Sequence, residues 1–216
     1  EFIKRIAPDG LEFLKFGKAD TDFISILFCD IRSFTSLSEK MSPQELVDFL
    51  NDFFKRMTEP ISNNKGFVDK FIGDGVMALF SIPEEPNAAD ALNSVIAAIS
   101  MQQQIDSFNK DNKMAEEKRL RIGIGIHSGP VIIGTVGSEE RMESTVTGDT
   151  VNLASRLEGL TKFYRSKILI SQSTYEFIDS ESSFEFRELD LVKVKGKDKP
   201  VTIFEVCNSD PEPIRE

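Results

Sequence analysis

Residues 70–80 (KFIGDGVMALF) constrain the fold more than any other stretch of this chain. Apolar runs flank an Asp-Gly pair, which favours the positive φ angles of a tight turn between antiparallel strands. The pattern predicts a β-hairpin with strands over 67–72 and 76–80. Asp74 stands at its tip, where turn chemistry alone and a functional role explain it equally well.

A second acidic residue, Asp30, ends an apolar run that begins at Phe23. Such a run is typical of a strand buried on both faces of a sheet. If this strand pairs beside the hairpin, the carboxylates of Asp30 and Asp74 converge at one sheet edge. Paired carboxylates suit hard divalent cations, which often bridge to substrate phosphates.

The composition describes one soluble globular domain of 216 residues, 40% hydrophobic and 29% charged. The net charge of −10 argues against nucleic acid as the main partner, because binding a phosphate backbone needs a basic face. It does not argue against a mononucleotide, which a few local cations and metal ions can hold.

Cys29 and Cys207 lie in apolar strand contexts without metal-ligand spacing, so we expect buried free thiols in a reducing, cytoplasmic compartment. No apolar run is long enough to insert in a membrane, and no signal peptide is evident. Because the chain begins with Glu, we expect it to be a piece of a longer protein, whose anchoring to a membrane is left open.

The order of patterns predicts the fold class. Ser42-Pro43-Gln44-Glu45 is a helix start with a capping box, and Pro60 is expected to end that helix. A second helix is expected from about 88, a second hairpin turning at Gly129-Pro130, and a helix from about 149. The result is an α/β (α+β) fold with a ferredoxin-like βαββαβ core, a mainly antiparallel sheet, helices on one face and added C-terminal strands.

Several polar residues could serve a site beside the two aspartates. Residues 31–35 form a turn entering a helix, where backbone N–H groups can cradle phosphate or Ser33 and Thr35 can merely cap. Asn152 and Arg156 share a helix face, which is more often simply solvated. Lys70 is predicted on the strand face of Val68 and Ile72, with its ammonium directed at a polar partner.

The remaining candidates are weaker. The alternating glycines of 121–126 leave one strand face open to close approach by another element. The turn around Lys195-Gly196-Lys197 offers two cations, although Lys-Gly-Lys is also an ordinary hairpin turn. His127, the only histidine, has no partner evident from spacing and is interpreted as structural.

Four motifs together resemble the class III nucleotidyl cyclase catalytic domain, over roughly residues 22 to 206. They are residues 28–35 (FCDIRSFT), 71–78 (FIGDGVMA), 145–157 (TVTGDTVNLASRL) and 194–197 (VKGK). Their number and order make the resemblance specific. It implies the class III cyclase fold, preceded by a connector over residues 1–21 from an upstream sensor or regulatory region and followed by a mobile tail over 207–216.

The resemblance also implies roles at the matching positions. Asp30 and Asp74 match the metal-binding aspartates, with the Ile31 carbonyl as a further ligand for two Mg²⁺ or Mn²⁺ ions per site. The other implied roles are the phosphate-cradling amides of Phe34 and Thr35, the base-reading Lys70 and Thr145, the ribose-orienting Asn152, the transition-state Arg156, and the phosphate-binding Arg141 and Lys195. The match through 138–143 is loose at Arg141, and Ser33 stands where many relatives have glycine.

The implied activity is an adenylate cyclase that converts ATP to cyclic AMP and pyrophosphate for signal transduction. Lys70 with Thr145 favours adenine, because guanylyl cyclases resemble one another in having Glu and Cys there. Threonine at 145 indicates the class IIIb subgroup, some of whose members respond to bicarbonate. The family forms head-to-tail dimers with two shared sites, so a homodimer is expected. The rivals are a guanylyl cyclase and a regulatory module that keeps the fold but turns over little.

Overall fold

The computed structural model describes residues 19–81, 88–113, 116–138, 141–178, 184–193 and 200–209. The strands are β1 (Ala19–Ile31), β2 (Gly66–Ile72), β3 (Gly75–Phe80), β4 (Ile122–Ser138), β5 (Arg141–Thr147), β6 (Ile168–Ser171), β7 (Phe186–Val192) and β8 (Val201–Val206). The helices are α2 (Phe34–Ser38), α3 (Pro43–Asn63), α4 (Ala88–Asp111), α5 (Asp149–Tyr164) and α6 (Gln172–Tyr175), with short 3-10 turns at Glu116–Lys118 and Cys207–Ser209.

One 8-stranded sheet organises the molecule, in the order β2-β3-β1-β4-β6-β8-β7, with β5 added to β4. β4 and β6 pair in parallel, and the other pairs of the described strands are antiparallel. The mixed α+β fold with a mainly antiparallel sheet and added C-terminal strands is therefore confirmed. The predicted hairpin is also confirmed, because β2 and β3 pair from Gly66↔Phe80 to Ile72↔Gly75.

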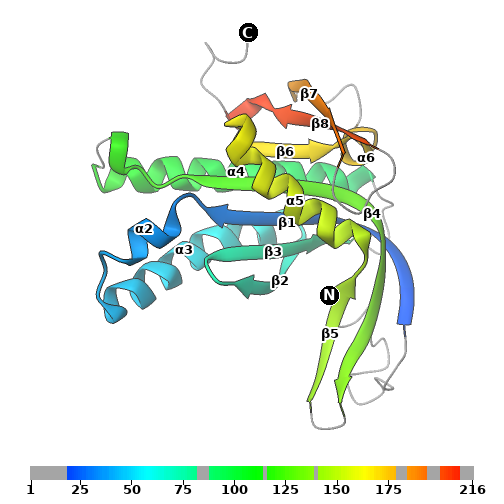
Figure 1. Ribbon diagram of the computed structural model, residues 1–216, viewed down its shortest axis with the longest axis horizontal. Helices are drawn as coiled ribbons and strands as arrows, with labels where there is room; N and C mark the ends of the chain where they lie inside the picture. Colours follow the sequence, from blue (N-terminus) through cyan, green and yellow to red (C-terminus); the bar gives the residue numbers. More distant parts are fainter. Residues whose placement is uncertain are drawn as a thin grey trace.

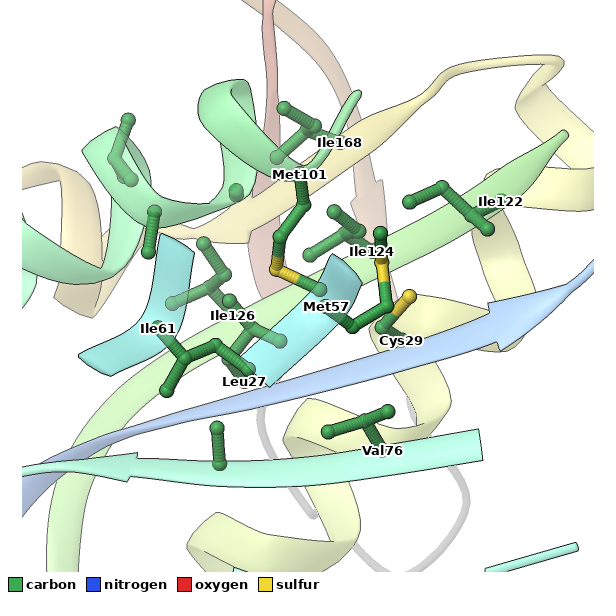
Figure 2. Close-up of a cluster of buried hydrophobic side chains, with 14 of the residues drawn as sticks. Leu27, Cys29, Met57, Ile61, Val76, Met101, Ile122, Ile124, Ile126 and Ile168 are labelled. Carbon is green, nitrogen blue, oxygen red and sulfur yellow. The ribbon is translucent and has the colours of Figure 1, made fainter. Parts of the chain in front are cut away.

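Helices cover both faces of this sheet, so the expectation of helices on one face is wrong. Figure 1 shows α5 in front of the sheet and α3 and α4 behind it. The main core lies between the sheet and α3 and α4, where Met57 and Met101 pack with Leu27, Cys29 and Ile124 (Figure 2). A separate apolar cluster on the other face joins Leu153 and Leu157 of α5 to Leu169 and Ile203.

The start of α3 follows its sequence signals, and its end does not. Glu45 N donates to Ser42 Oγ at 3.4 Å and Ser42 N donates to Glu45 Oε2 at 2.8 Å, so the predicted capping box is confirmed. Pro60 lies inside α3 rather than ending it. A proline near the end of a helix removes few hydrogen bonds, and burial of Pro60 and Ile61 keeps the last turn in place.

The predicted turn at Gly129-Pro130 is also wrong, because β4 runs through it. β1 pairs with β4 continuously from Ala19↔Gly134 to Ile31↔Ile122, and Pro130 lies opposite Phe23 within this ladder. The Pro130 carbonyl accepts a hydrogen bond from Thr150 Oγ1 at 2.6 Å. The long partner strand therefore outweighs the local turn signal. β4 instead pairs back on β5, and the two extend away from the body of the sheet (Figure 1).

The structure also bears on the predictions for the histidine, the two cysteines, membrane insertion and the terminal segments. His127 is buried and its Nδ1 lies 2.7 Å from Ser171 Oγ, consistent with a structural histidine. Cys29 and Cys207 are buried and not joined in a disulfide, as expected. Within the part of the chain that is described, no helix has the length and apolar character needed to span a membrane. Of the expected connector over 1–21 and tail over 207–216, residues 1–18 and 210–216 lie outside the described residues, whereas residues 19–21 belong to β1 and residues 207–209 form a 3-10 turn.

Candidate functional site

The ends of β1 and of the β2–β3 hairpin bring Asp30 and Asp74 together. β1 pairs with β3 up to Cys29↔Val76, which places the hairpin turn beside the end of β1. Gly75 fits closely there, since a Cβ atom on it would lie 3.2 Å from the Cys29 carbonyl oxygen and 3.5 Å from Asp30 Oδ1. The two carboxyl groups lie close enough for each to interact with the other. The convergence expected from the sequence is therefore present in the structure.

Burial and the neighbouring Asp74 perturb the Asp30 carboxyl group. Burial raises the pKa of Asp30 to about 7, helped by the hydrogen bond and charge of Asp74 and by the charge of Glu158. Asp74 Oδ2 is buried, and no described residue hydrogen-bonds to it. Such an oxygen is costly unless a cation or proton satisfies it. The arrangement suits a divalent cation, although no cluster of three or more acidic, His or Cys side chains forms in the described ranges.

The segment after Asp30 is a tight turn that leads into α2. Ile31 is buried, and Arg32 N donates to the Arg121 carbonyl at 2.8 Å. Ser33 adopts a left-handed conformation with φ 58°, which glycine adopts with less strain. The backbone N–H groups of Phe34 and Thr35 then open α2, where the first amides of a helix lack intrahelical acceptors.

A bulge in β2 sets the direction of Lys70. The register shifts between Val68 and Lys70, so Val68 pairs with Ala78 but Lys70 pairs with Met77. Ala78 faces α3 and α4, whereas Met77 belongs to the cluster on the other face, the face that α5 covers in part. The expectation that Lys70 shares a face with Val68 is therefore wrong, because Asp69 is an extra residue in the strand.

The same bulge supplies Lys70 with a polar partner. Lys70 Nζ lies 3.3 Å from Asp69 Oδ2, and the Asp69 side chain is only 6% exposed. The contact is an ion pair without hydrogen-bond geometry, since Asp69 Oδ2 has no hydrogen bond to the described residues. Neighbouring residues of a regular strand point to opposite faces, so only the bulge allows this contact.

Helix α5 carries the next two candidates. Leu153 and Leu157 are buried against the sheet, whereas Asn152 is exposed and Arg156 is half-buried. The predicted helix and its polar face are thus present. Gly125 allows α5 to lie close to β4, because a Cβ atom there would come within 2.6 Å of the Ala154 carbonyl oxygen. The close approach expected at the alternating glycines is confirmed.

Known proteins resemble this chain over nearly its whole length. Residues 17–206 match the family model described as the adenylate and guanylate cyclase catalytic domain. An adenylate cyclase of Anabaena cylindrica is 48% identical over 95% of this chain and 41% of its own length. The terminal-differentiation specific adenylate cyclase of Dictyostelium discoideum is 44% identical over 100% of this chain and 10% of its own length.

The chain belongs to this cyclase family. The adenylyl cyclase CyaB from P. aeruginosa has a similar crystal structure, with a TM-score of 0.78, 34% identity and coverage of 88% of this chain and 95% of that one. The guanylyl cyclase Cya2 gives a TM-score of 0.74 at 35% identity, covering 88% of this chain and 93% of that one. The cyclase fold predicted from the four motifs is confirmed, and the fold alone is common to neighbours of both nucleotide specificities.

The structure does not place every residue expected in the cyclase site. Thr145 and Arg141 are on β5, where Thr145 pairs with Gly134, but their side chains are not described. Lys195 lies outside the described residues. The structure thus brings Asp30 and Asp74 together, places Lys70 on the sheet face that α5 covers in part, and places Arg156 on α5 itself.

Three further polar residues beside the cyclase site were missed in the sequence. Asp69 holds Lys70, and Arg32 pairs with Glu158 across a sequence separation of 126. No local sequence pattern predicts either contact. The first depends on a β-bulge, and the second depends on the packing of a helix that is distant in the sequence. Only the proximity of Arg32 to Asp30 in the sequence could have drawn attention to it.

Proposed function

We propose that this chain is the catalytic domain of an adenylate cyclase, which converts ATP to 3′,5′-cyclic AMP and pyrophosphate. The carboxyl pair of Asp30 and Asp74 carries the proposal, because two neighbouring acidic groups with an unsatisfied buried oxygen suit the metal-dependent chemistry of polyphosphates. The relatives named adenylate cyclases at 48% and 44% identity support it.

Asp30 and Asp74, with the Ile31 carbonyl, would hold the divalent cations, Mg²⁺ or Mn²⁺. Two ions bound there would lower the pKa of the ribose 3′-hydroxyl and neutralise charge on the triphosphate. The 3′-oxygen attacks the α-phosphorus as its proton passes to solvent water, the bond from the α-phosphorus to the bridging oxygen breaks, and pyrophosphate leaves. The residues below bind and orient the nucleotide for this displacement.

The backbone amides of Phe34 and Thr35 would cradle phosphate oxygens, since they open α2 without intrahelical acceptors. Lys195 and Arg141 would add positive charge at the phosphates. Arg156 would stabilise the negative charge that develops in the transition state, and Asn152, one turn away on the same polar face of α5, would orient the ribose.

Lys70 with Thr145 would read adenine, through its ring nitrogen acceptor and exocyclic amine donor. The buried Asp69 carboxylate keeps the Lys70 ammonium on the α5 side of the sheet. ATP and GTP turnover of the wild type and of Lys70→Glu/Thr145→Cys tests this role. We expect ATP preference to weaken or reverse in the double variant. An unchanged preference would show that these two positions do not read the base.

We also propose a homodimer with two active sites, each taking Asp30 and Asp74 from one chain and Asn152 and Arg156 from the other. Asp74→Ala and Arg156→Ala homodimers should each be inactive, and mixing them should restore activity, because one heterodimer site keeps all its groups. Demonstrated heterodimers without activity would contradict shared sites. The wild-type homodimer, assayed in parallel for cyclic AMP formation, is the reference and should be active. A wild-type dimer that makes no cyclic AMP with Mg²⁺ or Mn²⁺ would favour a regulatory module instead.

The greater length of the relatives indicates which kind of region could accompany this domain in a whole protein. Because the chain spans 41% and 10% of the two adenylate cyclases above, those proteins contain further regions. A light-regulated bacterial adenylyl cyclase, 26% identical, is covered over 54% of its length. We therefore propose that an upstream sensor or regulatory region controls this domain in a cytoplasmic setting.

A further inference from the structure

A partly buried ion pair connects the turn after Asp30 to helix α5. Arg32 Nη1 donates to Glu158 Oε1 at 3.1 Å, and the two side chains are only 21% and 15% exposed. Arg32 follows Asp30 by two residues, and Glu158 follows Arg156 by two. One contact within the chain therefore joins the segment that carries a metal-binding aspartate to the helix that carries the transition-state arginine.

The sheet makes room for this pair at Gly123 of β4. A Cβ atom on Gly123 would collide with Arg32 Nη2 and would come close to Thr161 Oγ1. Any side chain at position 123 would therefore displace the guanidinium. Nη2 is buried, and no hydrogen bond joins it to another described residue. Glu158 is the one carboxylate recorded within ion-pair distance of Arg32 in the described ranges, so without it a buried charge would be left unpaired.

The two partners differ in how firmly the rest of the fold holds them. Helix α5 is fixed by the buried Leu153 and Leu157 and by its close approach to Gly125. The turn at Arg32 and Ser33 contains a left-handed residue and is joined to the rest of the sheet by a backbone hydrogen bond from Arg32 N to the carbonyl of Arg121, the residue before β4. The ion pair therefore anchors the turn to the helix rather than the helix to the turn.

An ordinary stabilising contact is the simpler interpretation, but it fits this pair poorly. A buried ion pair adds little net stability, because desolvation opposes the attraction between the charges. Burial raises the pKa of Glu158, and the Arg32 charge opposes that rise, so desolvation of the carboxylate offsets part of the attraction within the pair. Because the pair lies between the Asp30 turn and α5, we expect it to affect the position of the turn more than the stability of the fold.

We propose that Arg32 and Glu158 are positioning residues, which hold the turn over residues 30–35 in the conformation that binds the divalent cation and the phosphates. The inference rests on the proposed cyclase function. It goes beyond that function by assigning a task to two residues that touch neither the nucleotide nor the metal in the proposed mechanism. Residues that orient metal ligands in this way commonly contribute 10- to 100-fold to metal affinity.

Opposite charge changes distinguish positioning from simple electrostatics. If only charge near Asp30 and Asp74 mattered, Arg32→Gln would strengthen Mn²⁺ binding by removing a positive charge, and Glu158→Gln would weaken it. Positioning predicts that both variants weaken Mn²⁺ binding, by about 10-fold or more. Arg32→Lys keeps the charge and part of the contact and should lose less than Arg32→Gln.

The experiment is a titration of the purified domain with Mn²⁺ alone, followed by electron paramagnetic resonance, so it needs no turnover. The matched control is the Arg187–Glu205 pair of β7 and β8, in which the carboxylate is similarly buried. Arg187→Gln should leave Mn²⁺ binding unchanged. Mn²⁺ binding by Arg32→Gln that equals or exceeds that of the wild type would overturn the proposal. If Arg32→Gln does not fold, undiminished binding by the near-isosteric Glu158→Gln would overturn it equally.

The same titration separates this inference from the proposed function. Asp74→Asn should abolish the Mn²⁺ signal that the wild type gives, and a signal that survives this change would place the ion elsewhere and reject the site itself. In the complementing heterodimer, Glu158→Gln should lower activity about 10-fold in the chain that supplies Asp30 and Asp74. It should have a smaller effect in the chain that supplies Arg156. Equal losses in both chains would indicate general damage and contradict positioning of the turn.

Discussion

The two faces of the central sheet are built for different tasks, although the same strands supply both. On the face toward α3 and α4, β1 contributes Leu27, Cys29 and Ile31 to a continuous apolar core (Figure 2). On the face toward α5, the same strand contributes Ile26 and then Asp30. A shift of one residue along a strand thus separates core packing from the acidic site.

The acidic side chains on the α5 face should matter for turnover and little for folding. Asp74→Asn removes a metal ligand, so we expect cyclic AMP formation to fall by about 10²-fold or more. Thermal stability without metal should be unchanged or higher, because the variant relieves repulsion between Asp74 and Asp30. Turnover and melting temperature measure the two effects. Asp48→Asn, an exposed acid on α3, is the control and should change neither.

The opposite result is expected on the face toward α3 and α4. Met57 is fully buried between α3 and the sheet, beside Cys29 (Figure 2). Met57→Ala should lower the free energy of unfolding by about 2–5 kcal/mol through lost contacts and a cavity. The KM for ATP of the folded fraction should not change. Urea denaturation at fixed protein concentration measures the loss, with exposed Lys55→Ala as control. A changed KM at full folding would show that the two faces are not separable.

The same contrast explains how much could be predicted from sequence. Local signals were sufficient for the hairpin of β2 and β3, the capping box at Ser42 and the polar face of α5. The strand patterns were also sufficient to predict that Asp30 and Asp74 converge. The errors arose where a distant partner overrides a local signal: β1 carries β4 through Gly129 and Pro130, and core contacts keep Pro60 inside α3.

Contacts on the α5 face were the least predictable part of the site. The bulge at Asp69 reverses the face of Lys70, and no residue pattern marks it. Arg32 and Glu158 meet only because Gly123 and Gly125 let the helix and the guanidinium approach β4. Alternating glycines could indicate that something lies close, but not which residues. Side-chain partners across the sheet follow from packing, which sequence spacing does not encode.

The contact between α5 and β4 stabilises the fold and also positions Asn152 and Arg156. A change in this contact should therefore affect both stability and turnover. Gly125→Ala places a methyl group against the backbone of Ala154 and Glu158, which should destabilise the fold by about 1–3 kcal/mol. The displaced helix should also lower kcat by misplacing Asn152 and Arg156. Gly159→Ala, on an open position of α5, is the matched control and should be neutral or stabilising. Equal behaviour of the two variants would contradict the close fit of α5 on β4.

The smallest expected effect is a pH dependence that belongs to the α5 face alone. Burial raises the pKa of Asp30 to about 7 in the folded chain, well above the ordinary value of an aspartate, so the folded state holds the proton more tightly. Its contribution to stability is therefore complete below about pH 4 and declines as the pH rises toward about 7. Because Asp30 is only partly buried, solvent screens the effect and it should be modest.

Melting temperatures in EDTA across this range measure the decline. Asp30→Asn should lack it, so the melting temperature of the wild type relative to the variant should fall as the pH rises. Mn²⁺ should reverse the trend, since the cation competes with the proton for the same carboxyl oxygens. An identical pH profile for Asp30→Asn and the wild type would show that the proton is bound elsewhere. Proton binding on the α5 face would then not depend on the interaction of Asp30 with Asp74. The two faces would differ only in how their side chains pack.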